Sequence, residues 1–366
     1  MIVIADDITG AAEMAGIAFS KGQQVSLVCG DIVAADGTTV IATDTRSMTE
    51  SEAIAETQRI AKITQRGRFS ASRVWHAIRC VIFKKTDSAL RGHVVAELSA
   101  LMQTLGYQRA IYMPANPSKG RIIRGGIYYV NDKPIHETDF SFDPEFPAKT
   151  SVLRERFPDA EAKGIIMPDA ESKEDIKRVI ATYDDGQTLF AGAADLFEAV
   201  ISKTASESSS SRDTRNSRFT SDSTIFLCGS TQSKPLDLGI AITEMPRDIY
   251  DGGKDIKKWQ QEAAAIYEQT GSLMITIPHR HRTGKEVAVH LREMTATLIQ
   301  HLVAQRQPQQ LIIEGGASAF ATLQRLGWNE LEMVAQLAPG VIKTKAPNGT
   351  FVIMKPGSYA WGSLFM

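Results

Sequence analysis

The sequence is poor in cysteine and contains no paired arrangement of it. Its three cysteines, Cys29, Cys80 and Cys228, stand far apart, and none belongs to a C-x-x-C pair. An odd and sparse set of thiols argues against a disulfide framework and against a structural zinc site. No cluster of His, Asp and Glu has zinc-ligand spacing either, so we expect no resident metal site built by the protein alone.

The chain also lacks a charge excess and a long apolar run. It has 41 basic and 42 acidic residues, a formal net charge of -1, which predicts no general attraction to nucleic acid or to an anionic membrane. No apolar run approaches the length that spans a bilayer, and no basic leader precedes the first strand-like segment. We therefore expect a cytoplasmic protein that binds neither nucleic acid nor membrane.

What the sequence does contain is an alternation of short apolar runs and amphipathic stretches. Runs rich in β-branched residues, separated by helical patterns, predict βαβ units and mainly parallel sheets. These runs are residues 2–4, 40–42, 81–83, 110–113, 164–167 and 188–191, then 225–227, 273–277, 311–313 and 351–354.

Several helices can be placed between these runs. Apolar residues recur at helical spacing over residues 94–105, and Gly106 stands where that helix should end. A second such pattern covers residues 286–305. Ser47 followed by Glu50 predicts a capping box that opens the helix before Arg66.

A polar segment separates two expected domains. Residues 204–223 hold one aromatic residue and almost nothing to bury, which is typical of a flexible linker or insertion. The 366 residues, 43% of them hydrophobic, suffice for two cores. We therefore predict an α/β domain at 1–203, a linker or insertion at 204–223 and a second α/β domain at 224–366.

Polar residues gather where the first strands end. In open α/β sheets the loops after the carboxyl ends of parallel strands converge and bind ligands. Any single cluster could be a solvated loop, but four together favour one polar cleft. The candidates are Asp6, Asp7 and Gly10 after the first strand, Asp44 and Arg46 after the second, Lys84, Lys85, Asp87 and Arg91 at the third, and Asn116 and Arg121 after the fourth.

The composition of this cleft indicates its ligand. Its arginines and lysines could hold an anion, because guanidinium forks match carboxylate and phosphate geometry. Its aspartates could accept hydrogen bonds from hydroxyls, and one could act as a general base. A substrate that carries both a carboxylate and hydroxyls fits this mixture. Internal Asp–Arg pairing that neutralises the site without a substrate is the alternative.

The C-terminal half offers glycine-rich turns directly after strands. Glycine lets backbone N–H groups approach phosphate oxygens, and a following helix N-terminus favours negative charge. The chain has no G-x-x-x-x-G-K-[ST] loop and no G-x-G-x-x-G fingerprint, so a nucleotide site would need a different architecture. The residues of these turns are Gly229 and Ser230, then Gly315, Gly316, Ala317 and Ser318, and finally Gly357.

Taken in order, these motifs resemble those of the four-carbon acid sugar kinases, which have an N-terminal substrate domain and a C-terminal nucleotide domain. The resemblance covers most of the chain. It departs from the family pattern at Ser318, where a Thr is usual, and in the closing loop 355–362. The motifs that carry it are IADDITGA at 4–11, DTR at 44–46, KKTDSALRG at 84–92, PANP at 114–117, Gly120 with Arg121, the tract 129–138, Asp143 with Pro144, Gly229 with Ser230, GGAS at 315–318 and KPG at 355–357.

The resemblance implies ATP- and Mg²⁺-dependent phosphoryl transfer to the terminal hydroxyl of a four-carbon acid such as threonate, erythronate or a 3-oxo-tetronate. The general base would be Asp87, Asp6 or Asp7, and Arg46 and Arg91 would bind the substrate anion. Lys84 or Lys85 would bind that anion or the moving phosphoryl group.

The phosphates of ATP would lie on the Gly315–Gly316 turn, with Gly229, Ser230 and Gly357 around the nucleotide. The implied architecture is two three-layer α/β domains with the active site in the cleft between them. A homodimer is expected only from the general prevalence of such assemblies.

Two other functions are compatible with parts of this pattern. A haloacid-dehalogenase-type phosphatase needs D-x-D-x-T with the first Asp as nucleophile. The register of Asp7 and Thr9 puts Ala5 at that position, so the signature fails. A sugar-acid sensor that has lost ATP binding stays open, and binding of ATP with magnesium would discriminate it from a kinase.

Overall fold

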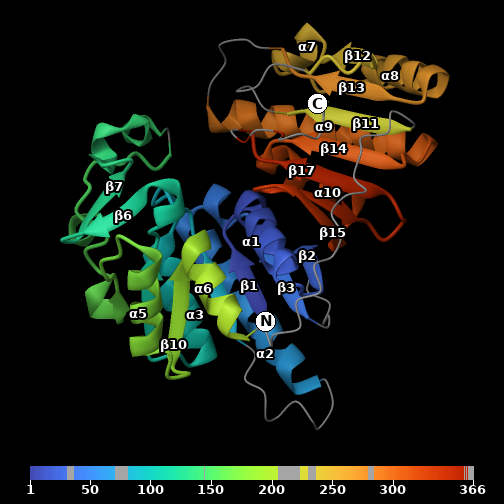
Figure 1. Cartoon of the computed structure of the whole chain (residues 1–366). Helices are drawn as coiled ribbons and strands as arrows, with labels where there is room; N and C mark the ends of the chain where they lie inside the picture. The colour runs from blue at the N-terminus through green and yellow to red at the C-terminus, as the bar shows by residue number, and fades with distance from the viewer. Residues whose placement is uncertain are drawn as a thin grey trace. The chain divides into compact units, whose positions relative to one another are not determined.

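The computed structural model of the chain divides into two compact units (Figure 1). The first comprises Met1–Gln24 and Ile32–Ser210, and the second Val25–Asp31 and Ser211–Met366. The structure describes residues 1–30, 37–70, 81–143, 145–204, 223–229, 236–278 and 284–357, with Tyr359 and Trp361; for 66–70 and 204 it describes the backbone alone. The expected linker therefore lies almost wholly outside the described residues.

The first unit is built on a parallel sheet. Its strands are continuous apolar runs because both faces of the sheet are covered. Ala5 pairs with Ala42 on one side and with Lys85 on the other, so these three strands end at the same edge. In spatial order the strands are β3 (Thr38–Ala42), β1 (Ile2–Ala5), β4 (Ile82–Lys85), β10 (Thr188–Gly192), β5 (Arg109–Met113) and β9 (Ile165–Ile166).

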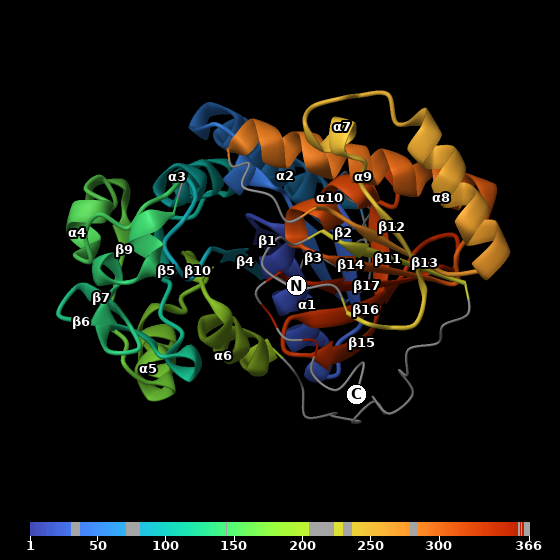
Figure 2. The same ribbon diagram turned by 90° about the horizontal axis from the view of Figure 1, so that it is seen from above.

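Helices cover both faces of this sheet, which gives the three layers that the sequence predicts. Figure 2 shows the two groups of helices on opposite sides of the strands. On one side α6 contacts both α1 and α5, and on the other α2 contacts α3. The helices are α1 (Ile8–Ser20), α5 (Lys173–Tyr183) and α6 (Ala194–Thr204), then α2 (Glu50–Ser70) and α3 (Val94–Leu105).

A small antiparallel sheet is inserted between β5 and β9, and the sequence analysis did not predict it. Its first hairpin turns at Gly125 and Gly126, whose φ values of 58° and 72° favour glycine. The segment contains β6 (Arg121–Arg124), β7 (Ile127–Val130), β8 (Lys133–Pro134) and α4 (Leu153–Arg156), with the 3-10 helices η3 (Pro117–Lys119), η4 (Ile135–Glu137), η5 (Asp139–Phe142) and η6 (Glu161–Lys163).

The second unit has a mixed sheet. The first five strands in spatial order are parallel and the last three are antiparallel. These strands are β12 (Ala241–Glu244), β13 (Leu273–Thr276), β11 (Thr224–Cys228), β14 (Gln310–Glu314) and β17 (Phe351–Lys355), then β16 (Val341–Lys345), β15 (Glu330–Ala338) and β2 (Val25–Cys29).

Strand β2 departs from the expected domain boundaries, because it comes from the N-terminal part of the chain. It pairs with β15, for example Leu27 with Leu331, and so belongs to the second unit. This long-range pairing leaves no local signal in the sequence.

The described helices of the second unit lie on one face of its sheet (Figure 2). Helix α9 contacts both α8 and α10. On the other face, a buried cluster that includes Phe226 and Ile353 packs against Leu236, Ile240 and Trp361, so loop residues form that layer. The helices are α7 (Arg247–Tyr250), α8 (Lys257–Thr270), α9 (Lys285–Gln305) and α10 (Gly316–Leu326). Both units are thus α/β, as predicted.

Two of the three local helix predictions are confirmed and one is wrong. Helix α3 ends at Gly106, whose φ is 76°, and α9 spans the expected segment. The capping box of α2 is formed by Thr49 and Glu52 rather than by Ser47 and Glu50. The Thr49 N–H donates to Glu52 at 2.9 Å, whereas Ser47 lies in the preceding 3-10 helix η1 (Thr45–Ser47) and donates to Asp44. Within the described residues, no helix is long and apolar enough to span a bilayer.

Candidate active site

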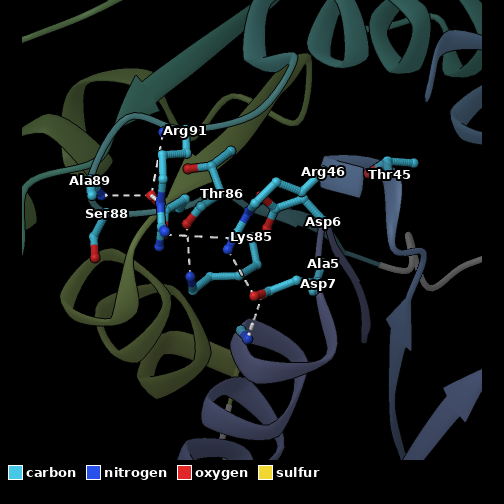
Figure 3. A network of polar contacts seen from close by, with 12 residues as sticks. Ala5, Asp6, Asp7, Thr45, Arg46, Lys85, Thr86, Ser88, Ala89 and Arg91 are labelled. Carbon is cyan, nitrogen blue, oxygen red and sulfur yellow. Dashed lines mark hydrogen bonds and ion pairs between the residues drawn. The ribbon is translucent and has the colours of Figure 1, made fainter. Parts of the chain in front are cut away.

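The predicted strand-end residues of the first unit meet around one arginine (Figure 3). The Arg46 guanidinium contacts Asp6 through Nε at 2.9 Å and Nη2 at 2.8 Å. Its Nη1 donates to Asp7 at 2.8 Å, and its Nη2 lies 3.6 Å from Asp87. Burial favours the neutral guanidinium, but the three carboxylates outweigh it and raise the pKa of Arg46 well above its ordinary value. This arginine therefore ties three strand ends together.

Asp7 is both a helix cap and a member of this cluster. Its carboxylate accepts a hydrogen bond from the Gly10 N–H at 2.7 Å, which satisfies a free donor at the start of α1. A Cβ at Gly10 would lie 2.9 Å from Asp7 Oδ1 and 3.2 Å from Lys85 Nζ, so a side chain there would displace the Asp7 carboxylate that caps the helix. Burial raises the pKa of Asp7, with a further contribution from Asp6, although Arg46 opposes it.

Asp87 is fully engaged by the loop that follows β4. Its Oδ2 accepts from the Ala89 N–H at 3.0 Å and from Arg91 Nε at 2.8 Å, and its Oδ1 accepts from Arg91 Nη2 at 3.0 Å. Burial opposes ionisation, but Arg46 and the bidentate Arg91 outweigh it and hold the pKa of Asp87 far below the ordinary 3.8. This carboxylate is therefore a loop-ordering anion and a weak base.

The depressed pKa of Asp87 predicts a contribution to acid stability. A carboxyl whose pKa is lower in the folded state stabilises the protein above its unfolded pKa, and that contribution is lost as the pH falls below about 4. We expect Asp87→Asn to cost about 2–3 kcal/mol at neutral pH, with the difference from wild type shrinking below about pH 4. Urea unfolding from neutral to acidic pH checks this. A difference independent of pH would show that the charge of Asp87 contributes nothing.

The Lys85 side chain lies on the same side of the sheet as Asp7, close to the carboxylate of Glu13, which was not among the predicted site residues. Its Nζ donates to the Thr86 carbonyl at 2.7 Å and lies 3.9 Å from Glu13. Glu13 in turn binds Lys119 at 2.5 Å. Burial favours protonation of Glu13, but Lys85 and Lys119 outweigh it and lower its pKa.

Arg121 and Asn116 come from the loop after β5. Asn116 is buried and exchanges backbone hydrogen bonds with Arg121, at 2.7 and 3.2 Å, which fixes the start of β6. The Arg121 guanidinium donates to Ser88 Oγ and lies over the Phe140 ring, 5.5 Å from its centroid. Within the described part of the chain, Arg121 forms no ion pair with a carboxylate.

Lys84 and Asp44 are not brought into the cluster. Because neighbouring residues of a strand face opposite sides, Lys84 points away from Lys85. Lys84 forms a 2.6 Å ion pair with Glu97, which also accepts from Thr45 at 2.9 Å. Asp44 has a φ of 55° and accepts from Ser47. These contacts of Lys84 and Asp44 are therefore with side chains outside the Arg46 cluster.

In the second unit the predicted glycine turns also converge at strand ends. Gly229 follows β11 and donates to the Glu314 carbonyl at 3.0 Å, and Gly315 donates to the Lys355 carbonyl at 2.9 Å. The side chains of Glu314 and Lys355 form a buried ion pair of 2.7 Å, which the sequence analysis missed. Lys355 also donates to the carbonyls of Pro356, Gly357 and Tyr359.

The remaining residues predicted to bind the nucleotide follow Gly315 and Gly229 in the chain. Gly316, Ala317 and Ser318 form the first turn of α10. A Cβ at Gly229 would lie 2.6 Å from Ser318 Oγ and 2.7 Å from the Glu314 carbonyl, so only glycine fits. Ser230 lies outside the described residues. Within them, no group of three His, Cys, Asp or Glu side chains is arranged to hold a metal ion.

Some of the site residues that were not predicted could have been identified from the sequence, and others could not. Lys355 lies within the closing KPG motif, and Glu314 directly precedes the GGAS turn. Their pairing could have been inferred from two opposite charges ending neighbouring strands. Glu13 and Lys119 carried no comparable signal, because their contact joins segments 106 residues apart.

Comparisons with known proteins agree with the two units. A family model described as "Sugar-binding N-terminal domain" matches residues 1–162, and one described as "Nucleotide-binding C-terminal domain" matches residues 243–359. A D-threonate kinase of Cupriavidus necator is 35% identical over 38% of this chain and 31% of its own length. A 3-oxo-tetronate kinase of Methylobacterium radiotolerans is 24% identical over 99% of this chain and 96% of its own.

A crystal structure shares the fold. That of a Haemophilus influenzae protein superposes with a TM-score of 0.70 at 18% identity, covering 100% of this chain and 98% of the other. The matches to the first curated relatives span from about a third to a half of those proteins' lengths, 31% and 53% for two D-threonate kinases. Both domain models match in the expected order, and the curated relatives are named as D-threonate and 3-oxo-tetronate kinases, so the chain belongs to the four-carbon acid sugar kinase family.

Proposed function

We propose that the protein transfers the γ-phosphoryl group of ATP to the terminal hydroxyl of a four-carbon acid sugar. The observation that carries the proposal is the buried cluster of carboxylates and cations in the first unit, beside which Arg121 forms no ion pair with a carboxylate of the described residues. The nearby Glu13, whose pKa Arg121 helps to lower, is itself paired with Lys119. The kinase names of the relatives and the nucleotide-binding match of the second unit support it.

Arg121 is the residue that we assign to the carboxylate of the substrate. The other arginines of the cluster are already neutralised, Arg46 by Asp6 and Asp7 and Arg91 by Asp87. Arg121 is half-buried and held in place by Ser88 and Phe140. A guanidinium fixed in this way can bind a carboxylate through two parallel hydrogen bonds.

The nucleotide would bind at the strand ends of the second unit. Glycine at positions 229 and 315, directly after two strands, would let phosphates approach the backbone, and the start of α10 favours negative charge. Mg²⁺ usually binds one or two carboxylates together with substrate phosphates, so it can arrive with ATP without a site of three protein ligands. Bound in this way, ATP supplies the phosphoryl group and Mg²⁺ neutralises its charge.

Replacing Arg121 by Ala tests the carboxylate assignment. We expect the KM for the acid to rise about 10- to 100-fold, since hydrogen bonds between charged groups contribute about 1.5–3 kcal/mol, while the KM for ATP stays the same. Arg124→Ala is the matched control, because Arg124 lies on the same strand but pairs with the surface residue Glu171. Equal effects of the two substitutions would contradict the assignment.

ATP binding separates the kinase from a sensor that has lost nucleotide use. We expect calorimetry to detect binding of MgATP to the full chain, and Gly229→Ala to abolish it, because the added Cβ would clash with Ser318 and the Glu314 carbonyl. Wild-type protein that binds the acid but not MgATP would favour the sensor.

A further inference from the structure

Among the described residues of the first unit, three buried side-chain oxygens lack a hydrogen-bond partner: Asp6 Oδ1, Thr86 Oγ1 and Tyr112 Oη. Tyr112 lies within β5, whereas Asp6 and Thr86, each only 2% exposed, belong to the strand-end cluster. A buried polar atom without a partner costs free energy, and native proteins contain few of them. Each therefore requires an explanation, and a missing ligand is one.

The two atoms belong to neighbouring positions of the sheet. Asp6 directly follows Ala5, and Thr86 directly follows Lys85, the residue with which Ala5 is paired in register. Figure 3 shows both residues in the network around Arg46. The unsatisfied atoms thus lie at the carboxyl ends of adjacent parallel strands, where ligands bind in such sheets.

In the other two aspartates of the cluster, both carboxylate oxygens have hydrogen-bond donors. Asp87 accepts hydrogen bonds at both oxygens, from Arg91 and from the backbone. Asp7 accepts from Gly10 at Oδ1 and from Arg46 at Oδ2. Asp6 alone uses one oxygen, Oδ2, for Arg46 and leaves the other unpaired.

The chemistry of the pair selects a hydroxyl group. An ionised carboxylate oxygen can only accept a hydrogen bond, whereas a threonine hydroxyl can donate one. An alcohol that donates to Asp6 and accepts from Thr86 satisfies both atoms at once. A carboxylate or phosphate at this position would be repelled by Asp6.

We propose that Asp6 Oδ1 and Thr86 Oγ1 together bind the hydroxyl of the acid sugar that becomes phosphorylated; this inference rests on the proposed kinase function. Asp6 is then placed to act as the general base. The hydroxyl oxygen forms a bond to the γ-phosphorus, the bond from that phosphorus to the bridging oxygen of ADP breaks, and the hydroxyl proton passes to Asp6 Oδ1. Thr86 holds the hydroxyl oxygen in line.

Thr86→Val tests the hydroxyl site without removing a charge. The dissociation constants of D-threonate, D-erythronate and their 4-deoxy analogues (2,3-dihydroxybutanoates) are measured by calorimetry with EDTA present and without nucleotide. We expect the preference for the better-bound hydroxy acid over its 4-deoxy analogue, which lacks only the terminal hydroxyl, to fall at least tenfold. Thr86→Ser, which keeps the hydroxyl, should restore it. The ligand-free Tm of Thr86→Val should equal or exceed that of wild type, because an unsatisfied oxygen is replaced by a methyl group.

The outcomes distinguish this inference from the proposed function. An unchanged preference in Thr86→Val, in an enzyme that phosphorylates the acid, overturns the hydroxyl site and leaves the kinase intact. An equal loss of affinity for the 4-deoxy analogue also overturns it, because that indicates a general disturbance. A loss seen only when Mg²⁺ is added would make these oxygens part of a metal site instead. Wild-type protein that neither binds nor phosphorylates any of these acids rejects the proposed function itself.

Discussion

Replacing Lys84 by Met is expected to destabilise the protein by about 3–5 kcal/mol, because removing one partner of a buried ion pair leaves the other charge uncompensated. The side chains of Lys84 and Glu97 are 1% and 2% exposed and lie 2.6 Å apart. Thr45 and Thr57 also donate to the Glu97 carboxylate, at 2.9 and 3.4 Å, and cannot neutralise it. Chemical unfolding of wild type and variant measures the loss.

The double variant Lys84→Met with Glu97→Leu provides the sharper comparison. Removing both charges takes the Glu97 acceptor from the Thr57 hydroxyl, whereas the Thr45 hydroxyl keeps its 2.9 Å contact with Thr43 Oγ1. Most of the lost stability should therefore return. Lys177→Met, at a surface lysine that is 68% exposed, should change stability by less than about 0.5 kcal/mol. If Lys84→Met unfolds like wild type but has lost activity, Lys84 acts in the substrate site, as the family resemblance first implied.

Replacing Asp6 by Asn is expected to lower kcat about 10²- to 10⁴-fold, the usual contribution of a general base. The amide oxygen of Asn can still accept from Arg46, so the cluster should keep its shape. The KM for the acid should change much less than kcat. Steady-state kinetics with the best acid measure both constants.

Asp87→Asn is the matched comparison for Asp6→Asn. Because Asp87 is held by Arg91 and by two backbone N–H groups, its loss should act mainly through stability, with activity falling as the loop after β4 loosens. A folded Asp87→Asn variant without turnover, beside an active Asp6→Asn variant, would transfer the base role to Asp87.

The parallel sheets and the cluster of the first unit were predictable from sequence for one physical reason. Strands buried on both faces are continuous apolar runs, and their carboxyl ends meet at one edge, so polar residues that follow them must approach one another. Asp6, Arg46 and Asp87 were found in this way. The same strand geometry could have separated Lys84 from Lys85, because consecutive residues face opposite sides.

Other features could not be predicted from local pattern. Strand β2 pairs with β15 across about 300 residues, a contact that leaves no periodic signal. The pairing of Glu13 with Lys119 likewise depends on how the inserted segment after β5 folds back. Which aspartate keeps an unpaired oxygen depends on side-chain orientation, so the sequence left Asp6, Asp7 and Asp87 equivalent.

The most direct test of the account is ADP formation from ATP and magnesium by the full chain, measured across a panel of D- and L-threonates, erythronates and 3-oxo-tetronates. The account predicts acid-dependent ADP formation with at least one member and none with succinate. Folded protein that binds MgATP yet forms no ADP with any four-carbon hydroxy acid would contradict it.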